Sequence, residues 1–181
     1  MKKVNVFLRD RFETVEALAV IDVLRRAGIE VETVSLMDDL AVKSAQGITV
    51  MADKMYEDCD FSKTDLYFLP GGPGTKGYES RPDFLELIKE AYSDGKWISA
   101  ICAAPSILGH LGILQGKKAT CFPGFEKDLY GAEFVDEKVV VDGNVITSRG
   151  MGTSIDLGLE LVSILVSPDK AREIGKGVQY L

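Results

Sequence analysis

Cys102 is the residue of this sequence that is best placed for nucleophilic chemistry. It stands between an apolar run that predicts a buried strand, residues 97–101, and a helical pattern that begins directly after it. So abrupt a junction predicts a strained turn at the carboxyl end of the strand, with the cysteine at its apex. The first N–H groups of the following helix would point at the sulfur and favour a thiolate over a thiol. The alternative is a small, inert, buried thiol, which is the commonest state of a free cysteine.

Glu16 is the second residue that the pattern singles out. Steps of three and four residues from Glu16 along a helix predicted over residues 13–27 meet only apolar side chains, at Ala19, Val20, Val23 and Ala27. A carboxyl group on that buried face, with no cation beside it, would have a raised pKa and could donate a hydrogen bond to a neighbouring thiolate. The alternative is a first-turn residue that reaches solvent and is favoured by the helix dipole.

His110 is the only histidine, and therefore the natural candidate for a general base. It follows Cys102 by eight residues. On one continuous helix this spacing is about 12 Å along the axis, too far for a direct contact, so we expect His110 on the helix surface. Cys59 and Cys121 are expected to be structural thiols, because the three cysteines have neither disulfide nor zinc-ligand spacing.

Two glycine-rich loops, residues 71–74 and 150–152, follow predicted strands. Glycines there permit a positive φ and leave backbone N–H groups unobstructed. Neither loop matches a Walker or a dinucleotide fingerprint. The sequence therefore predicts no cofactor and no metal.

The elements that must position these residues alternate along the chain. Strands are predicted at residues 3–8, 29–36, 65–70 and 97–101, helices at 13–27, 81–93, 155–166 and 168–179, a hairpin at 139–147 and shorter extended pieces within 45–52 and at 118–121. Helical crossovers between strands make neighbouring strands parallel, whereas the hairpin adds an antiparallel one. The prediction is an α/β three-layer sandwich, one domain over residues 1–181, with ligands at the carboxyl ends of a mostly parallel sheet.

Composition excludes several classes of protein. The chain has 181 residues, of which 46% are hydrophobic and 27% charged, with a formal net charge of -7. An acidic chain of this kind argues against nucleic acid or an anionic membrane surface as a partner, because phosphate binding needs clustered Lys and Arg. No apolar run approaches the roughly 20 residues that span a bilayer. The predicted location is the cytoplasm, with free thiols.

Four motifs together make the sequence recognisable. They are residues 100–105 (AICAAP), 69–72 (LPGG), 147–153 (TSRGMGT), and Glu16 ahead of residues 22–28 (DVLRRAG). In this order, over nearly the whole chain, they resemble the DJ-1/PfpI (ThiJ) superfamily. The resemblance implies a flavodoxin-like sandwich related to class I glutamine amidotransferases, and usually a homodimer.

The resemblance also implies roles for particular residues. Cys102 would be the reactive, oxidation-prone cysteine and Glu16 its carboxyl partner. The N–H groups of Gly72 and Ala103 would be donors to an oxyanion or to an oxidised sulfur. Arg26 resembles an arginine that reaches across the dimer in relatives, and Arg149 lies in a loop that borders the same pocket.

One position departs from many members of the superfamily. Where they carry a histidine near the cysteine, this chain has Phe122 before Pro123, preceded by Cys121. The bacterial YajL-like branch resembles it in this respect. The departure argues against protease or strong glyoxalase activity.

Two functional hypotheses follow. The first is a cysteine-dependent enzyme of the glyoxalase III or deglycase type, in which Cys102 adds to methylglyoxal or to its early adducts with proteins and Glu16 moves the proton. The alternative is an oxidative-stress sensor or chaperone-like protein, without turnover, that works through oxidation of Cys102. A third hypothesis, an amidotransferase or peptidase, is disfavoured by the missing histidine.

Overall fold

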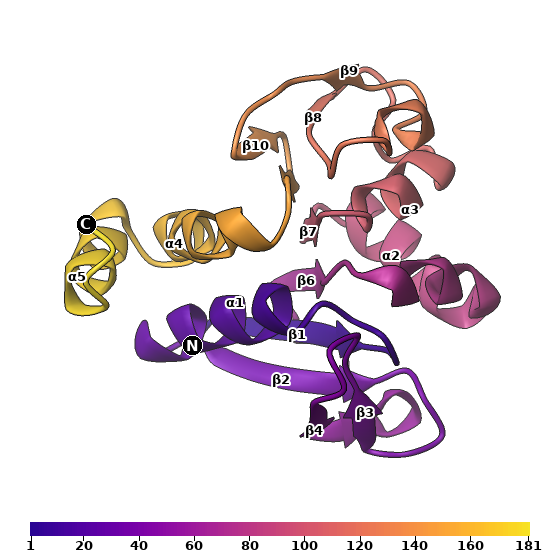
Figure 1. Cartoon of the computed structure of the whole chain (residues 1–181), viewed down its shortest axis with the longest axis horizontal. Helices are drawn as coiled ribbons and strands as arrows, with labels where there is room; N and C mark the ends of the chain where they lie inside the picture. Colours follow the sequence, from indigo (N-terminus) through magenta and orange to yellow (C-terminus); the bar gives the residue numbers. More distant parts are fainter.

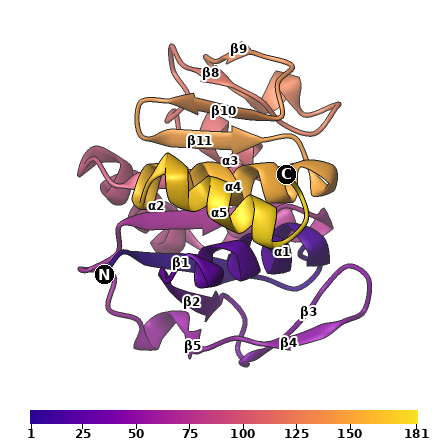
Figure 2. The same cartoon turned by 90° about the vertical axis from the view of Figure 1, so that its left-hand side faces the viewer.

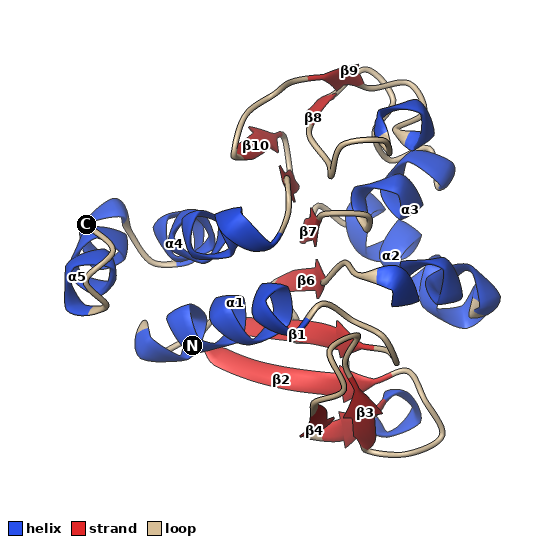
Figure 3. Cartoon of the chain, viewed as in Figure 1, coloured by secondary structure: helices blue, strands red, loops and turns tan.

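A seven-stranded sheet lies at the centre of the computed structural model, which describes residues 1–181, and helices cover both of its faces (Figures 1 and 3). The strands follow one another across the sheet in the order β10-β11-β7-β6-β1-β2-β5. Within this sheet, β10 and β11 are the only neighbouring strands that pair antiparallel. The strands of this sheet are β1 (Lys3–Leu8), β2 (Glu30–Ser35), β5 (Lys54–Met55), β6 (Leu66–Leu69), β7 (Trp97–Ile101), β10 (Val139–Asp142) and β11 (Val145–Ser148).

The middle of the sheet is formed by β1, β6 and β7, which are neighbours although they are far apart in sequence. Nearly every residue of these strands is buried. Strands with helices on both faces are expected to be mostly apolar, as these are, although the polar Asn5 and Ser99 are buried within them. Their carboxyl ends lie at one edge of the sheet, because all three run parallel.

Helices α1 (Thr14–Arg26), α4 (Ser154–Leu165) and α5 (Pro168–Gly177) lie on one side of the sheet, and α2 (Pro82–Ser93) and α3 (Pro105–His110) on the other (Figures 1 and 2). The apolar helix α4 packs against both α1 and α5, which explains why its sequence is hydrophobic all round. No helix of the structure combines the length and the apolar character needed to cross a membrane.

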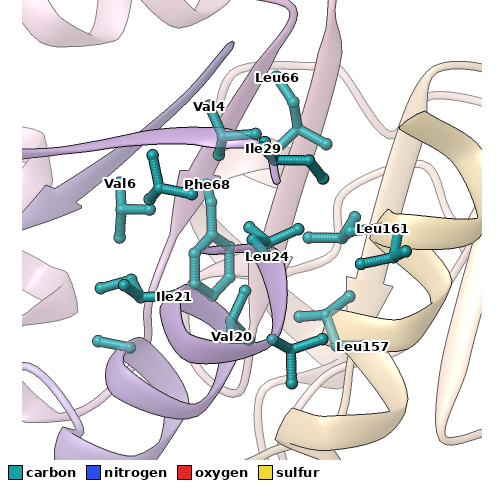
Figure 4. Packing of buried hydrophobic residues seen from close by; sticks show 14 of the residues in the cluster. Val4, Val6, Val20, Ile21, Leu24, Ile29, Leu66, Phe68, Leu157 and Leu161 are labelled. Carbon is teal, nitrogen blue, oxygen red and sulfur yellow. The ribbon is translucent and has the colours of Figure 1, made fainter. Parts of the chain in front are cut away.

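The core on the α1 side joins helix and sheet. In Figure 4 the ring of Phe68, from β6, points toward Val20 and Leu24 of α1, with Leu157 of α4 close by. All four side chains are fully buried. Burying a side chain of this size contributes about 1.5–3 kcal/mol, so this cluster fixes α1, and with it Glu16, on the sheet.

Most predicted elements are confirmed, with ends that coincide or differ by one or two residues. The uncertain stretch within residues 45–52 contributes β4 (Thr49–Met51), which pairs antiparallel with β3 (Ala41–Lys43). Two pairings were not expected: β5 joins the edge of the main sheet, and β8 (Lys118–Ala119) pairs with β9 (Glu133–Phe134). These strands have two residues each, too short for a periodic pattern to reveal them.

Helix α4 has no side-chain cap at its start, although threonine and serine there are residue types that commonly provide one. Neither Thr153 nor Ser154 caps the helix with its hydroxyl. The Thr153 hydroxyl instead contacts the hydroxyl of Ser148 at 2.7 Å and donates to the carbonyl of Gly150 at 2.9 Å. These contacts fix the loop after β11 rather than the helix.

Candidate functional site

Cys102 lies at a strained corner directly after β7. Its φ is +65°, in the left-handed region that residues other than glycine rarely adopt. Its N–H donates to the carbonyl of Ser148 at 3.0 Å, and its carbonyl accepts the N–H of Phe122 at 2.8 Å. Hydrogen bonds on both sides therefore hold the corner in this conformation, as the abrupt strand-to-helix junction predicts.

Gly71 allows the corner to approach β6 closely. A Cβ atom on Gly71 would lie 2.6 Å from the Cβ of Cys102 and 2.7 Å from Oε2 of Glu16. No side chain fits between them. The N–H of Gly71 also donates to Oε2 of Glu16 at 3.0 Å. This glycine therefore brings the cysteine and the carboxyl group together.

Glu16 is buried, with 1% of its surface exposed, on the face of α1 that meets the sheet. Burial raises its pKa from 4.5 to about 7, while hydrogen bonds with Cys102 and with the N–H of Gly71 oppose that shift. The prediction of a buried carboxyl group with a raised pKa is confirmed. Near neutral pH such a group both accepts and returns a proton.

The prediction that the following helix favours a Cys102 thiolate is wrong. Burial and the nearby Glu16 carboxylate raise the pKa of Cys102 to about 12, although N–H groups of Gly72 and Ala103 donate to the sulfur and oppose the shift. Helix α3 begins only at Pro105 and has six residues, so its N-terminus neither adjoins the sulfur nor carries a long dipole. The Cys102 thiol is hydrogen-bonded to Glu16, so its charge depends on whether Glu16 accepts its proton.

An open cavity of about 470 Å³ lies over Cys102. The start of α1, the β3–β4 hairpin and the loop after β6 form part of its walls. The rest of the walls are formed by the corner at Cys102 and by the loops that carry Phe122, Phe125 and Met151. The lining residues are Glu13, Glu16, Gln46, Gly72, Pro73, Cys102, Ala103, Phe122, Phe125 and Met151. A volume in this range suits a small organic molecule.

Five of these lining residues were not named from the sequence as site residues, namely Glu13, Gln46, Pro73, Phe125 and Met151. Gln46 reaches the start of α1 from the hairpin: its Oε1 accepts the hydroxyl of Thr14 at 2.6 Å, and its Nε2 donates to Glu13 at 2.9 Å. Glu13 does not cap α1 with its side chain. The N–H of Thr14 donates instead to Oε1 of Gln46, so the hairpin supplies an acceptor for the first turn of the helix. The only sequence signal was the extended piece predicted within residues 45–52.

Phe122 borders the cavity where relatives were expected to carry a histidine. Its ring is 47% exposed. The ring lies close to Gly150, since a Cβ on that glycine would be 3.3 Å from its Cδ2 atom. Where an imidazole would supply a base, this chain therefore presents an apolar edge.

Three other residues named from the sequence do not line the cavity. Arg26 forms an exposed ion pair with Asp22 at 2.7 Å, on the last turn of α1. Arg149 forms an ion pair with Asp136. Cys121 is 1% exposed, and burial raises the pKa of its thiol to about 12, as expected of a structural cysteine.

His110 lies outside the Cys102 cavity, as predicted. The helix that carries it starts three residues after Cys102, so the assumption of one continuous helix was wrong while the conclusion stands. Its Nδ1 lies 2.5 Å from Oε1 of Glu79. Cys59 donates to the carbonyl of Met55 at 3.2 Å, and burial raises its pKa to about 11. No three His, Cys, Asp or Glu side chains come together in a way that could hold a metal ion.

Known proteins resemble this chain over most of its length. A model of the DJ-1/PfpI family matches residues 2–164. DJ-1 homolog B of Arabidopsis thaliana is 38% identical over 176 residues, which cover 96% of this chain and 40% of that protein. The chain thus spans about two fifths of that relative's length.

Two other relatives match over most of both chains. A deglycase from Pyrococcus abyssi is 32% identical over 165 residues, 90% of this chain and 99% of that one. A glutathione-independent glyoxalase from Caenorhabditis elegans is 32% identical over 166 residues, 91% of this chain and 88% of that one.

Solved structures give the same result for the fold. A DJ-1 superfamily protein from Salmonella typhimurium superposes with a TM-score of 0.95 at 33% identity, over 100% of both chains. Toxoplasma gondii DJ-1, in an oxidized form, superposes with a TM-score of 0.95 at 32% identity, over 99% of both chains. The three-layer, flavodoxin-like sandwich with a mostly parallel sheet is therefore shared.

Proposed function

Because this chain belongs to the DJ-1/PfpI family, we propose that it is a Cys102-dependent enzyme of the glyoxalase III or deglycase type. Its substrates would be methylglyoxal or the early adducts that methylglyoxal forms with protein thiols and amines. The observation that carries the proposal is the contact of Cys102 with a buried Glu16 whose pKa is about 7. Relatives named deglycase and glyoxalase support it.

The first step forms a bond between the Cys102 sulfur and the aldehyde carbon of methylglyoxal. Ionised Glu16 accepts the thiol proton as the sulfur attacks, which overcomes the high pKa of the thiol. The carbonyl electron pair moves to oxygen, where N–H groups of Gly72 and Ala103 are available as donors. Glu16 then gives its proton to that oxygen, which forms the hemithioacetal and leaves Glu16 ionised.

The second step moves a hydrogen between the two substrate carbons. Glu16 removes the proton from the former aldehyde carbon and returns it to the neighbouring carbon, while the hydroxyl proton passes to the former ketone oxygen. The hemithioacetal thereby becomes a lactoyl thioester on Cys102. Water then breaks the carbon–sulfur bond. In sum, methylglyoxal and water become lactate and a proton, and the thiol is restored.

Measuring lactate from methylglyoxal tests this function. Cys102→Ser and Glu16→Gln should each lower the rate by at least about 100-fold, since each removes a nucleophile or a proton carrier. Cys59→Ser is the matched control, because Cys59 lies outside the cavity, and it should retain the wild-type rate. Equal rates in all four proteins would refute the proposal.

The alternative function, a sensor of oxidative stress, would use the same residues without turnover. The geometry that favours it is a partly exposed sulfur beside N–H donors and a carboxyl group that can hold a proton. Peroxide would add two oxygens to give a sulfinate, which a protonated Glu16 would stabilise. Intact mass and peptide mapping after graded peroxide should then place both oxygens on Cys102, and a disulfide with Cys121 would indicate a thiol switch instead.

A homodimer is part of the proposal. The start of α1 and the β3–β4 hairpin expose apolar side chains, of which Val15 is 44% and Met51 62% exposed. Arg26 lies on the exposed side of the same helix. Sedimentation should give a dimer that Arg26→Glu weakens, whereas Arg172→Glu, an equal charge change on α5, should not; a monomer at all concentrations would contradict the dimer.

A further inference from the structure

A second cavity lies beside the one over Cys102, with a volume of about 280 Å³. The two cavities share four wall residues, namely Gly72, Pro73, Ala103 and Phe125. Of these, Gly72 and Ala103 carry the N–H groups that contact the Cys102 sulfur. The second cavity therefore adjoins the first at the backbone that carries these N–H groups.

One part of this cavity is built around the single histidine. His110 Nδ1 lies 2.5 Å from Glu79 Oε1, and its Nε2 lies 3.7 Å from Asp128 Oδ1. The first distance is a hydrogen bond and the second is too long for one. The carboxylate of Glu79 is thus engaged, whereas the structure shows no hydrogen bond to the carboxylate of Asp128.

A cation without a partner lines the same cavity. Lys76 precedes Glu79 by three residues in a 3-10 helix, Pro73–Ser80, where residues three apart eclipse each other and would normally pair. Glu79 contacts His110 instead, and Lys76 forms no ion pair. The cavity therefore presents an ammonium group without an ion pair and the carboxylate of Asp128, which accepts no hydrogen bond, together with the apolar Ile107 and Phe125.

We propose that this cavity binds the α-amino and α-carboxylate groups of a free amino acid whose side chain carries the methylglyoxal fragment. Lys76 would bind the carboxylate and Asp128 the ammonium group. The volume is slightly below the roughly 300–1,000 Å³ of pockets for drug-sized ligands, which suits one amino acid. A residue within a protein lacks both charges, since its amine and carboxyl form peptide bonds.

The inference rests on the proposed function and specifies its substrate class. For a thiol adduct, the Cys102 sulfur would bond to the former aldehyde carbon as the carbon–sulfur bond of the adduct breaks, and the amino acid would leave as a free thiol with the proton of Cys102. The hydrogen on that carbon would then move to its neighbour, and water would cleave the lactoyl thioester and restore the Cys102 thiol. The products are thus lactate, a proton and the free amino acid.

A binding experiment tests the cavity without any turnover. Because His110 is the only histidine, its ring protons give isolated NMR signals that report on this cavity. Methionine, an unreactive amino acid with both charges, should shift these signals, and N-acetylmethioninamide, which has neither charge, should not. Lys76→Met and Asp128→Asn should each weaken methionine binding about three- to fivefold, the value of one partly exposed ion pair.

Lys63→Met is the matched control, because Lys63 precedes β6 at the opposite end of that strand, and it should bind methionine as the wild type does. Absence of a methionine-dependent shift, or equal shifts with N-acetylmethioninamide, would overturn the inference.

A kinetic comparison separates the inference from the proposed function. Lys76→Met should raise KM about three- to fivefold for the methylglyoxal adduct of homocysteine but not for that of 2-mercaptoethanol. If neither adduct yields lactate, the proposed function fails, and the NMR result still decides the binding site.

Discussion

The N–H of Phe122 donates to the carbonyl of Cys102 at 2.8 Å, so the backbone of residue 122 supports the corner while its side chain faces the cavity. The N–H of Cys102 is held in turn by Ser148. Since both bonds involve only backbone atoms, side chains around the corner can change without loss of its conformation. This separation permits a direct test of what the missing imidazole means.

Phe122→His should make Cys102 more reactive. A protonated imidazole beside the sulfur favours the thiolate, and lowering the thiol pKa by one unit gives about tenfold more thiolate near neutral pH. The rate of alkylation by iodoacetamide at pH 6 to 8 measures this. Phe122→Asn, polar but without charge, is the control and should react as slowly as the wild type. If the two variants react at the same rate, the identity of residue 122 does not govern the thiol.

Glu16→Gln should change how stability depends on pH. The folded pKa of Glu16, about 7, lies above its ordinary 4.5, so the folded state binds more protons than the unfolded state. Stability from this group is complete below pH 4.5 and is lost as the pH rises through 7. The wild type should therefore lose roughly 3 kcal/mol relative to Glu16→Gln between pH 4 and pH 8.

Urea denaturation of both proteins at several pH values measures that difference. The two proteins have all other titrating groups in common, so the difference between their stability curves isolates the contribution of Glu16. Stability curves that run parallel across this range would show that Glu16 ionises as freely in the folded chain as in the unfolded one.

Gly71→Ala should abolish activity although Gly71 contributes no reacting group. The new Cβ would lie 2.6 Å from the Cβ of Cys102 and 2.7 Å from Oε2 of Glu16, so one of the two must move. Overpacking of this kind costs about 1–3 kcal/mol. Lactate formation and urea denaturation measure both effects. Gly177→Ala is the control, because nothing lies within 4 Å of its Cβ position, and activity that survives Gly71→Ala would contradict the requirement for close contact.

Gln46→Met should weaken the start of α1. The substitution keeps the length of the side chain but removes the acceptor for Thr14, and losing a cap of this kind costs about 1 kcal/mol. The turnover number should fall, since Glu16 lies in the same first turn. Ile48→Ala, at a side chain that is 51% exposed in the same hairpin, is the control. Unchanged stability would mean that Gln46 contributes no cap.

The sequence predicted the fold well where elements are long or strongly apolar. Strands such as β1 and β7 and helices such as α1 and α2 follow from periodicity, glycine stops and a first-turn proline. The pairing of β5 and of β8 with β9 could not be predicted, because two-residue strands are defined by their neighbours and not by their own pattern. Thr153 does not cap α4, because its hydroxyl contacts the hydroxyl of Ser148 instead.

The central pair of the site was also predictable, since an abrupt strand-to-helix junction marked Cys102 and an apolar stripe marked Glu16. The charge of the Cys102 sulfur could not be predicted from the sequence. Desolvation and the distance to a carboxylate decide it, and both depend on how Gly71 lets separate segments meet. Gln46 was missed for the same reason, because its role lies in a contact between a hairpin and a helix that no local pattern reveals.

The neighbouring order of β1, β6 and β7 has a consequence for how the chain acquires its chemistry. Glu16, Gly71 and Cys102 each follow a different one of these strands, so they meet only when pairings between distant parts of the chain have formed. Contacts of such large sequence separation are slow to form. A newly made or refolding chain therefore carries Cys102 as an ordinary thiol until its central sheet closes. Activity should then be among the last native properties to appear, after most of the helical signal in a refolding experiment.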